Sequence, residues 1–382
     1  MLDRRRRLWL ATLANFCFFV SVTSFFTLPV HLEALGAGRA EVGRVMGSFG
    51  AVSLWAIPLT GALADRYGRR PFLALGALLW CAAALGFVLV RHLGALVYAL
   101  RLLQGLGFSL VFVSTNALIV DLAPEGQLGR SIAIFGTATL AAHAVGPSVS
   151  ELVTLQVAFA GLFVAAAVVA ILALVLFWSV GETGSRRDPM EVRYSTLQML
   201  RRPTALGALC AAFTAACGFG AAIHFMSVFV RARGLGVHTP FFVSYVVLAI
   251  AVRLVMGGLG DRIGHHRVAV VATFAFGCAV LTLGFTASPL ALVLTGAIFG
   301  AAHGMSYPSL NALFVEGVPP SARARAMAAF NLAFNVGVTL AAFGAGELAE
   351  RFGYTTMWFV FGAVALSGAF IATLDRPRPA AP

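Results

Sequence analysis

Arg101 is a charged residue within residues 94–119, an otherwise apolar stretch. It lies about two helical turns from the first residue of that stretch. Charged groups at membrane depth usually face a water-filled cavity or pair with another group. The position therefore predicts a role in handling a substrate or protons. Two alternatives stay open: the side chain could extend outward to the membrane surface, or it could form a static pair with Glu151 or Glu33.

Three histidines lie in separate apolar stretches, His143 and His303 near the middle and His224 nearer an end. Histidine can gain or lose a proton near neutral pH, which suits proton coupling. Hydrogen-bonded packing between helices is the alternative for each of them, and for the asparagines nearby. We assign the polar residues of these stretches to a candidate substrate and proton pathway, which comprises Arg101, Gln104, His143, His224, His303, Tyr307, Asn331, Asn335, Asn15 and Glu151.

Acidic residues are missing from the middle of every apolar stretch, because Glu33, Glu151 and Glu347 all lie near ends. Their absence, with Arg101 and three histidines present, favours neutral or anionic compounds over cationic ones. The sequence contains neither a Gly-x-Ser-x-Gly nor a His-Glu-x-x-His pattern, and the three histidines of the apolar stretches lie on separate stretches without paired acids. We therefore expect no enzyme, no metal site and no cofactor.

The elements that carry these residues follow from the composition. Of 382 residues, 60% are hydrophobic and 11% are charged, and the mean hydropathy is +0.90. A soluble domain carries about 25% charged residues, so lipid must be the solvent here. Helices of about 20 apolar residues cross a bilayer because their backbone groups are satisfied internally. Twelve such stretches can be drawn, at about residues 8–31, 41–63, 71–90, 94–119, 131–152, 157–179, 204–230, 239–260, 268–287, 290–314, 324–347 and 356–374.

The net charge is +12, and all 27 basic residues are arginine. They cluster in short connections between apolar stretches, which argues against nucleic-acid binding. About nineteen lie on the side of both termini and about six on the other, and such an excess marks the cytoplasmic side. We expect a multi-pass protein of the bacterial inner membrane, with both termini in the cytoplasm and an uncleaved first span.

An internal repeat divides the chain. Residues 61–70 read GALADRYGRR and residues 257–267 read GGLGDRIGHHR, at an offset of 196 residues. Residues 116–124, NALIVDLAP, match residues 311–319, NALFVEGVP, at an offset of 195. Two parallel halves of this kind form one large class of transporters.

The fold class that we expect is therefore all-α and integral to the membrane, with twelve transmembrane helices in two parallel six-helix halves. The expected division is a bundle at residues 1–180, a cytoplasmic connection at 181–203 and a second bundle at 204–382.

The motifs resemble those of the major facilitator superfamily. Residues 61–70 are similar to its signature G-x-L-x-D-R-x-G-R-[RK] between the second and third helices, and residues 101–107, RLLQGLG, to its R-x-x-Q-G-x-G motif. Gly146-Pro147 resembles the core of the antiporter motif G-P-x-x-G-G, but Ser150 and Glu151 replace the two glycines. The resemblance covers the whole chain and is to twelve-helix bacterial exporters of drugs and metabolites, including sugar-efflux-like ones.

In this family the loop motif latches the outward-open state, and the resemblance implies the same role here. We expect Gly61 and Gly68 to allow a close helix approach and a turn, and Asp65 to meet a helix N-terminus or Arg70. Asp121 and Glu316 are expected as ionic partners of the loops. The alternative is that these residues only set the topology. The implied latch comprises Gly61, Asp65, Arg66, Gly68, Arg69, Arg70, Asp121, Arg253, Asp261, Arg262 and Glu316.

The function implied by the resemblance is secondary active transport by alternating access. We expect proton-coupled export of small organic compounds, neutral or anionic rather than cationic, by a protein that works as a monomer. The partners are a small-molecule substrate, protons and the lipid bilayer. Two alternatives stay open: a proton symporter that imports an organic anion or a sugar, and a membrane receptor with a transporter fold.

Overall fold

The computed structural model describes residues 3–183, 196–202, 204–319 and 322–374, and these ranges contain helices and short connections without any strand. Most of the expected connection at 181–203 lies outside the described residues, apart from the short helix α7 (Thr196–Leu200). The chain divides into two compact units. The first unit comprises residues 1–187 and 237–243, and the second comprises residues 188–236 and 244–382.

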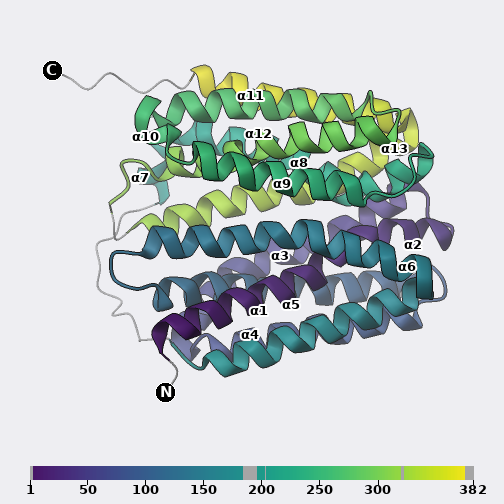
Figure 1. The fold of residues 1–382 in the computed structure, drawn as a ribbon, viewed down its shortest axis with the longest axis horizontal. Helices are drawn as coiled ribbons and strands as arrows, with labels where there is room; N and C mark the ends of the chain where they lie inside the picture. The colour runs from purple at the N-terminus through teal and green to yellow at the C-terminus, as the bar shows by residue number, and fades with distance from the viewer. Residues whose placement is uncertain (1–2, 184–195, 203, 320–321, 375–382) are drawn as a thin grey trace. The chain divides into compact units, whose positions relative to one another are not determined.

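In the first unit, α1 packs along α6, and both α3 and α4 pack against α5 (Figure 1). A short 3₁₀ turn continues α1 into α2, so that one nearly continuous helical segment covers the first expected span. The helices of this unit are α1 (Arg4–Ser24), α2 (Leu28–Ala34), α3 (Arg39–Tyr67), α4 (Arg70–Gly86), α5 (Ala95–Leu122) and α6 (Leu128–Val180).

In the second unit, α13 packs along α8, and α11 packs against both α12 and α13 (Figure 1). The expected span at 239–260 is interrupted at Gly257 and Gly258, so that a long and a short helix replace it. The helices are α8 (Ala205–Ala232), α9 (Thr239–Met256), α10 (Leu259–Ile263), α11 (His265–Leu283), α12 (Pro289–Val315) and α13 (Arg323–Leu374). The first five residues of α9 belong to the first unit.

Two of these helices are too long for one membrane crossing. The described chain has ten helices that are long and apolar enough to span a bilayer, but α6 has 53 residues and α13 has 52. Fifty residues of helix extend about 75 Å, whereas the hydrocarbon core of a bilayer is about 30 Å thick. Each of the two contains a non-helical residue, Ala158 (φ 66°, ψ −179°) and Gly353 (φ 80°, ψ 167°), and so comprises two helices. The two breaks are related by the repeat offset.

Glycine positions explain how the helices come so close within each unit. A Cβ added to Gly105 of α5 would overlap the carbonyl oxygen of Phe49 in α3, and one added to Gly300 of α12 would overlap that of Tyr245 in α9. Both pairs are related by the repeat offset. A Cβ on Gly107 would lie 2.7 Å from the carbonyl oxygen of Gly76 in α4. The glycines of the RLLQGLG motif are therefore required by helix packing.

In each unit, an arginine that precedes or begins the first long helix caps the C-terminal end of another helix, α5 in the first unit and α12 in the second. Arg4 donates from Nε to the carbonyl of Leu122 (3.2 Å) and from Nη2 to that of Asp121 (2.9 Å), at the end of α5. Arg202 donates to the carbonyls of Phe314 and Glu316, at the end of α12. The last carbonyls of a helix have no partner within it, so these charges stabilise both ends.

Candidate functional site

Arg101 is buried in the first unit among neutral groups. Its side chain is 3% exposed, and its Nη1 donates to Oε1 of Gln104 at 2.8 Å. Longer contacts, both 3.4 Å, reach the carbonyl oxygens of Val45 and Met46 in α3, and the guanidinium lies 4.8 Å from the ring centre of Phe49. Because the side chain is buried, it does not extend outward to the membrane surface. Within the described residues Arg101 forms no ion pair, so the alternative of a static pair with Glu151 or Glu33 does not describe it either.

Asn15 of α1 and His143 of α6 both contact Thr139 of α6. Nδ2 of Asn15, which is fully buried, donates to Oγ1 of Thr139 at 2.7 Å. The His143 ring nitrogen Nδ1 lies 3.0 Å from the carbonyl oxygen of the same Thr139, and its ring packs on Phe26 at 5.7 Å. The structure thus brings these two predicted residues together.

Glu151 is held by the start of α9, within the first unit. Its Oε1 lies 2.8 Å from Nδ1 of His238, and the backbone N–H groups of His238 and Thr239 donate to its two oxygens at 2.9 and 3.0 Å. His238 is 3% exposed, and its Nε2 lies 3.3 Å from Oγ1 of Thr27. Thr27 in turn contacts Oγ of Ser150 at 2.5 Å. A helix N-terminus stabilises a carboxylate, so the start of α9 holds Glu151 in this position.

This network also explains a departure from the family motif. Ser150 and Glu151, which stand where the motif has glycines, provide the hydroxyl and the carboxylate. Gly146 is kept for packing, because its Cβ would lie 2.8 Å from the carbonyl oxygen of Val20 in α1.

In the second unit, His303 lies in an aromatic cluster. Its ring stacks on Phe219 of α8, with centres 4.6 Å apart and planes 6° apart. The hydroxyl of Tyr245 in α9 lies 3.2 Å from Nδ1 of His303. His224 is buried in α8 further along, so the histidines of this unit do not form one group.

Tyr307, Asn331 and Asn335 form a hydrogen-bonded series between α12 and α13. The Tyr307 hydroxyl donates to Oδ1 of Asn331 at 2.7 Å, and Nδ2 of Asn335 donates to the carbonyl of Asn331 at 2.8 Å. Arg253, which we assigned to the latch, donates from Nε to the carbonyl of Gly304 at 3.1 Å and lies near Tyr245 and Tyr307. One of its neighbours, Tyr307, is therefore a residue of the candidate pathway.

The loop motif of the first unit is organised by Arg69. Its Nη1 lies 2.5 Å from Oδ1 of Asp65, and its Nε lies 3.5 Å from Oδ2 of Asp121. The expectation that Asp65 meets Arg70 or a helix N-terminus was wrong, because Arg69 lies one turn after Asp65 and Arg70 instead stacks on Trp178 at 3.6 Å. The expected partnership of Asp121 with the loop is confirmed.

Glu182, which the sequence did not single out, caps the N-terminus of α4. Its two carboxylate oxygens accept from the backbone N–H groups of Arg69 (2.9 Å) and Arg70 (3.0 Å). Gly68 turns the chain there with φ +94°, and a Cβ on it would lie 2.7 Å from Glu182. Gly68 therefore serves the expected turn. Gly61 does not serve a close approach, since its Cβ would meet only Val113, at 3.9 Å.

Glu182→Gln is expected to lower the free energy of unfolding by about 1 kcal/mol, because an amide loses the charge that stabilises the α4 N-terminus. Thermal unfolding of the purified protein would show this as a lower midpoint. Glu125→Gln, on an exposed loop of the same unit, is the control. Equal midpoints for Glu182→Gln and the wild type would contradict the capping role.

The remaining latch residues are more dispersed. Arg66 is exposed and packs over the ring of Tyr67 at 5.2 Å. Glu316 contributes its backbone carbonyl to Arg202, and within the described residues its carboxylate forms no ion pair with the loop. Arg262 is exposed on α10, and the side chain of Asp261 lies outside the described residues.

Sequence reasoning missed His238, Thr139, Tyr245 and Glu182. His238 precedes a Thr-Pro pair that starts a helix, and Glu182 directly follows an apolar span. These positions indicate helix-end caps, which was the available signal. Thr139 and Tyr245 had no signal, because only tertiary packing brings them to Asn15, His143 and His303.

Comparisons with known proteins agree on one family. The sequence profile described as Major Facilitator Superfamily matches residues 8–257 and 241–382. The multi-drug resistance efflux pump PmrA of Streptococcus pneumoniae serotype 4 is 27% identical over 360 residues, covering 90% of this chain and 88% of the pump. The multidrug resistance protein MdtG of Klebsiella pneumoniae is 26% identical over 398 residues, covering 98% and 93%.

Solved structures share the fold. A mutant form of the nucleoside transporter NupG superposes with a TM-score of 0.79 at 14% identity, over 98% of this chain and all of NupG. The human organic anion transporter MFSD10 gives 0.72 at 18% identity, over 97% of this chain and all of MFSD10. With a profile match along its whole length, a repeated helical architecture and the loop motif, the chain belongs to the major facilitator superfamily of membrane transporters and is not an enzyme.

Proposed function

We propose that the protein exports small organic compounds in exchange for protons, by alternating access. Two efflux pumps are similar to it over most of their length, which supports export. Neutral or anionic compounds are preferred over cationic ones.

The observation that carries this substrate preference is the environment of Arg101. Its guanidinium is buried against Gln104, two carbonyl oxygens and an aromatic ring, and no carboxylate among the described residues compensates its charge. Burying a charge without a partner is costly. A transported compound with a negative or hydrogen-bond-accepting group would supply that partner, whereas a cation would be repelled.

The proposal includes the arrangement in the membrane. Dividing α6 at Ala158 and α13 at Gly353 gives twelve spans, in a bundle at residues 1–180 and another at 204–382. The arginine asymmetry supports termini in the cytoplasm and a bacterial inner membrane. A single chain carries both halves of the repeat, so a monomer suffices.

The pair of Glu151 and His238 is our candidate for the proton-carrying group. The carboxylate oxygen and the imidazole nitrogen are within hydrogen-bonding distance, so one proton can be shared between them. The pair is buried, so loss of the proton would leave a single charge that the backbone N–H groups of α9 still stabilise. His143 lies on α6 with Glu151, and Asn15 lies on α1, which leads into the 3₁₀ turn that carries Thr27; His143 and Asn15 extend the polar path.

Glu151→Gln is expected to remove most of the change in export rate between about pH 6 and pH 8, because an amide cannot exchange a proton with the His238 ring as we propose the carboxylate does. The rate would be measured in proteoliposomes at each pH with equal pH on both sides. Glu347→Gln is the matched control, because Glu347 stands at the repeat-related position but pairs with the exposed Arg351. Equal pH profiles in both variants would contradict the role of Glu151.

Export itself is tested by the accumulation of fluorescent neutral and anionic compounds in bacterial cells. Cells that express the protein should retain less compound than cells with an empty vector, and an uncoupler should abolish the difference. Greater retention would instead support the symporter, and binding of a compound to purified protein without any flux would support the receptor.

A further inference from the structure

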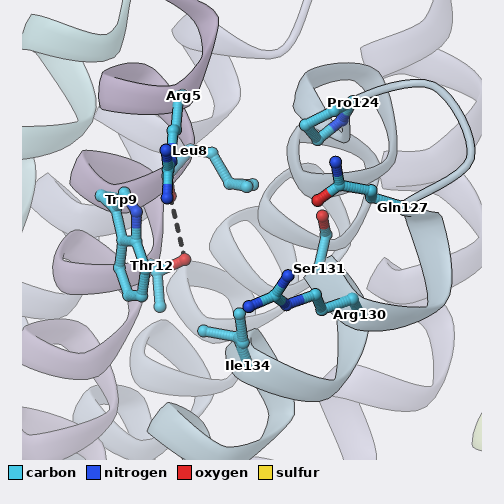
Figure 2. A pocket seen from close by; sticks show the side chains of 9 residues that line it. All are labelled: Arg5, Leu8, Trp9, Thr12, Pro124, Gln127, Arg130, Ser131 and Ile134. Atoms are coloured by element: carbon cyan, nitrogen blue, oxygen red, sulfur yellow. Dashed lines mark hydrogen bonds between the residues drawn. The ribbon is translucent and has the colours of Figure 1, made fainter.

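A small cavity lies at the arginine-rich end of the first unit, and its lining includes neither Arg101 nor any residue of the loop motif. It has a volume of about 340 Å³, and lies between the start of α1 and the start of α6 (Figure 2). Arg5 and Trp9 line it from α1, and Gln127, Arg130 and Ser131 line it from the other side. The Arg130 side chain points from α6 toward α1 (Figure 2).

The cavity has two arginines and no acidic residue in its lining. Arg5 differs from Arg4 and Arg7 of the N-terminal arginine run in its hydrogen bonding. Arg4 is engaged by carbonyls at the end of α5, and Arg7 donates to the carbonyl of Val180 at 2.7 Å. Within the described residues, the guanidinium groups of Arg5 and Arg130 form no hydrogen bond or ion pair. Two cations that line one cavity without a counter-charge in its lining favour an anion there.

Neutral donors in the cavity fit the same chemistry. Ser131 is 4% exposed, and within the described residues its hydroxyl has no hydrogen-bond partner. It lies in the first turn of α6, which starts at Leu128, where backbone N–H groups and the helix dipole favour an anion. An anionic oxygen in the cavity would give this hydroxyl a hydrogen-bond acceptor.

The surface beside the cavity is apolar. Trp9 is 53% exposed, and Leu13, one turn further along α1, is 48% exposed. Tryptophan is enriched at the level of lipid headgroups, and a basic pocket between helices on the cytoplasmic side suits the headgroup of an anionic lipid. This end is cytoplasmic in the membrane arrangement that we propose above from the arginine asymmetry. An anion bound there would have an apolar surface next to it that suits an acyl chain.

We propose that this cavity binds the phosphate group of an anionic phospholipid of the inner leaflet. Arg5 and Arg130 pair with the phosphate, Ser131 donates to it, and Trp9 and Leu13 contact the glycerol and the first part of the acyl chain. Free inorganic phosphate shares the charge chemistry but lacks the apolar part. The inference does not depend on which compound the protein transports.

The test is native mass spectrometry of the full chain in a neutral detergent with added phosphatidylglycerol. We expect the double variant Arg5→Gln/Arg130→Gln to bind this lipid about tenfold more weakly than the wild type, because two charge-assisted contacts are lost. The matched control, Arg6→Gln/Arg91→Gln, removes the same charge at exposed positions outside the cavity and should bind like the wild type. Equal weakening in both double variants would overturn the proposal.

Two further arms identify the ligand. Ser131→Val fills the cavity without changing the charge, and should also weaken binding of phosphatidylglycerol severalfold; unchanged binding in this variant would overturn the site. Phosphatidylcholine and inorganic phosphate are the competing probes. Displacement of the lipid by inorganic phosphate at equal concentration would assign the cavity to a free anion and overturn the lipid assignment, whereas weak competition by both probes supports it.

Discussion

Arg101→Gln is expected to lower the rate of export about ten- to hundredfold, the effect of losing one hydrogen bond to a charged group. The buried guanidinium is the fixed charge that we propose a substrate pairs with, and glutamine keeps the polarity without the charge. The amount and the thermal stability of the folded protein should not fall, because the variant also removes an uncompensated buried charge. The measurement is initial rates of compound flux in proteoliposomes.

Two comparisons sharpen this result. Arg91→Gln removes an exposed arginine of the same unit and should leave the flux unchanged. Arg101→Lys keeps the charge but cannot reproduce the guanidinium contacts with Gln104 and the carbonyl oxygens of α3, so an intermediate rate is expected. An unchanged flux in Arg101→Gln would show that Arg101 serves only packing. It would contradict the proposed preference of the protein for neutral or anionic compounds.

Gly105→Ala and Gly300→Ala are expected to lower the free energy of unfolding by about 1–3 kcal/mol each, the usual cost of overpacking. The neighbour of each added methyl group is a backbone carbonyl, of Phe49 and of Tyr245, which cannot rotate away. The helix pairs α3–α5 and α9–α12 would have to separate. Thermal unfolding in detergent would show lower midpoints for both variants, and expression would yield less folded protein.

Gly136→Ala is the matched control for these two variants. Gly136 lies inside α6, and an added Cβ would have no atom within 4 Å of it. Because alanine favours a helix more than glycine does, this variant should be as stable as the wild type or more stable. Equal losses of stability at all three positions would show that close packing is not what requires Gly105 and Gly300.

The helical architecture could be predicted largely from the sequence. Apolar stretches locate the helices because lipid leaves backbone groups no other partner, and the repeat locates corresponding features in both halves. The breaks at Ala158 and Gly353 were anticipated as the ends of separate spans, although helical structure continues on both sides of each break. The division of residues 239–260 at Gly257 and Gly258 was not anticipated, because two glycines within an apolar run do not by themselves interrupt a helix.

The site could be predicted in its residue types but not in its contacts. Arg101 with Gln104, and Tyr307 with Asn331, lie where the motif and the apolar spans placed polar groups. The sequence prediction paired Asp65 with Arg70 instead of Arg69. The two arginines are adjacent in the sequence, and the turn at Gly68 determines which of their side chains points toward Asp65. His238 was missed because it lies in a connection, where a histidine has no distinguishing pattern until α6 packs against it.

Proton coupling of compound flux is the central claim, and proteoliposomes with an entrapped pH-sensitive dye test it most directly. A proton gradient would be imposed, and pools of neutral, anionic and cationic compounds would be added to wild type and to Arg101→Gln. We predict that neutral or anionic compounds move protons in the wild type, that cationic ones do not, and that Arg101→Gln abolishes the signal. Flux of a compound without movement of protons would contradict the account.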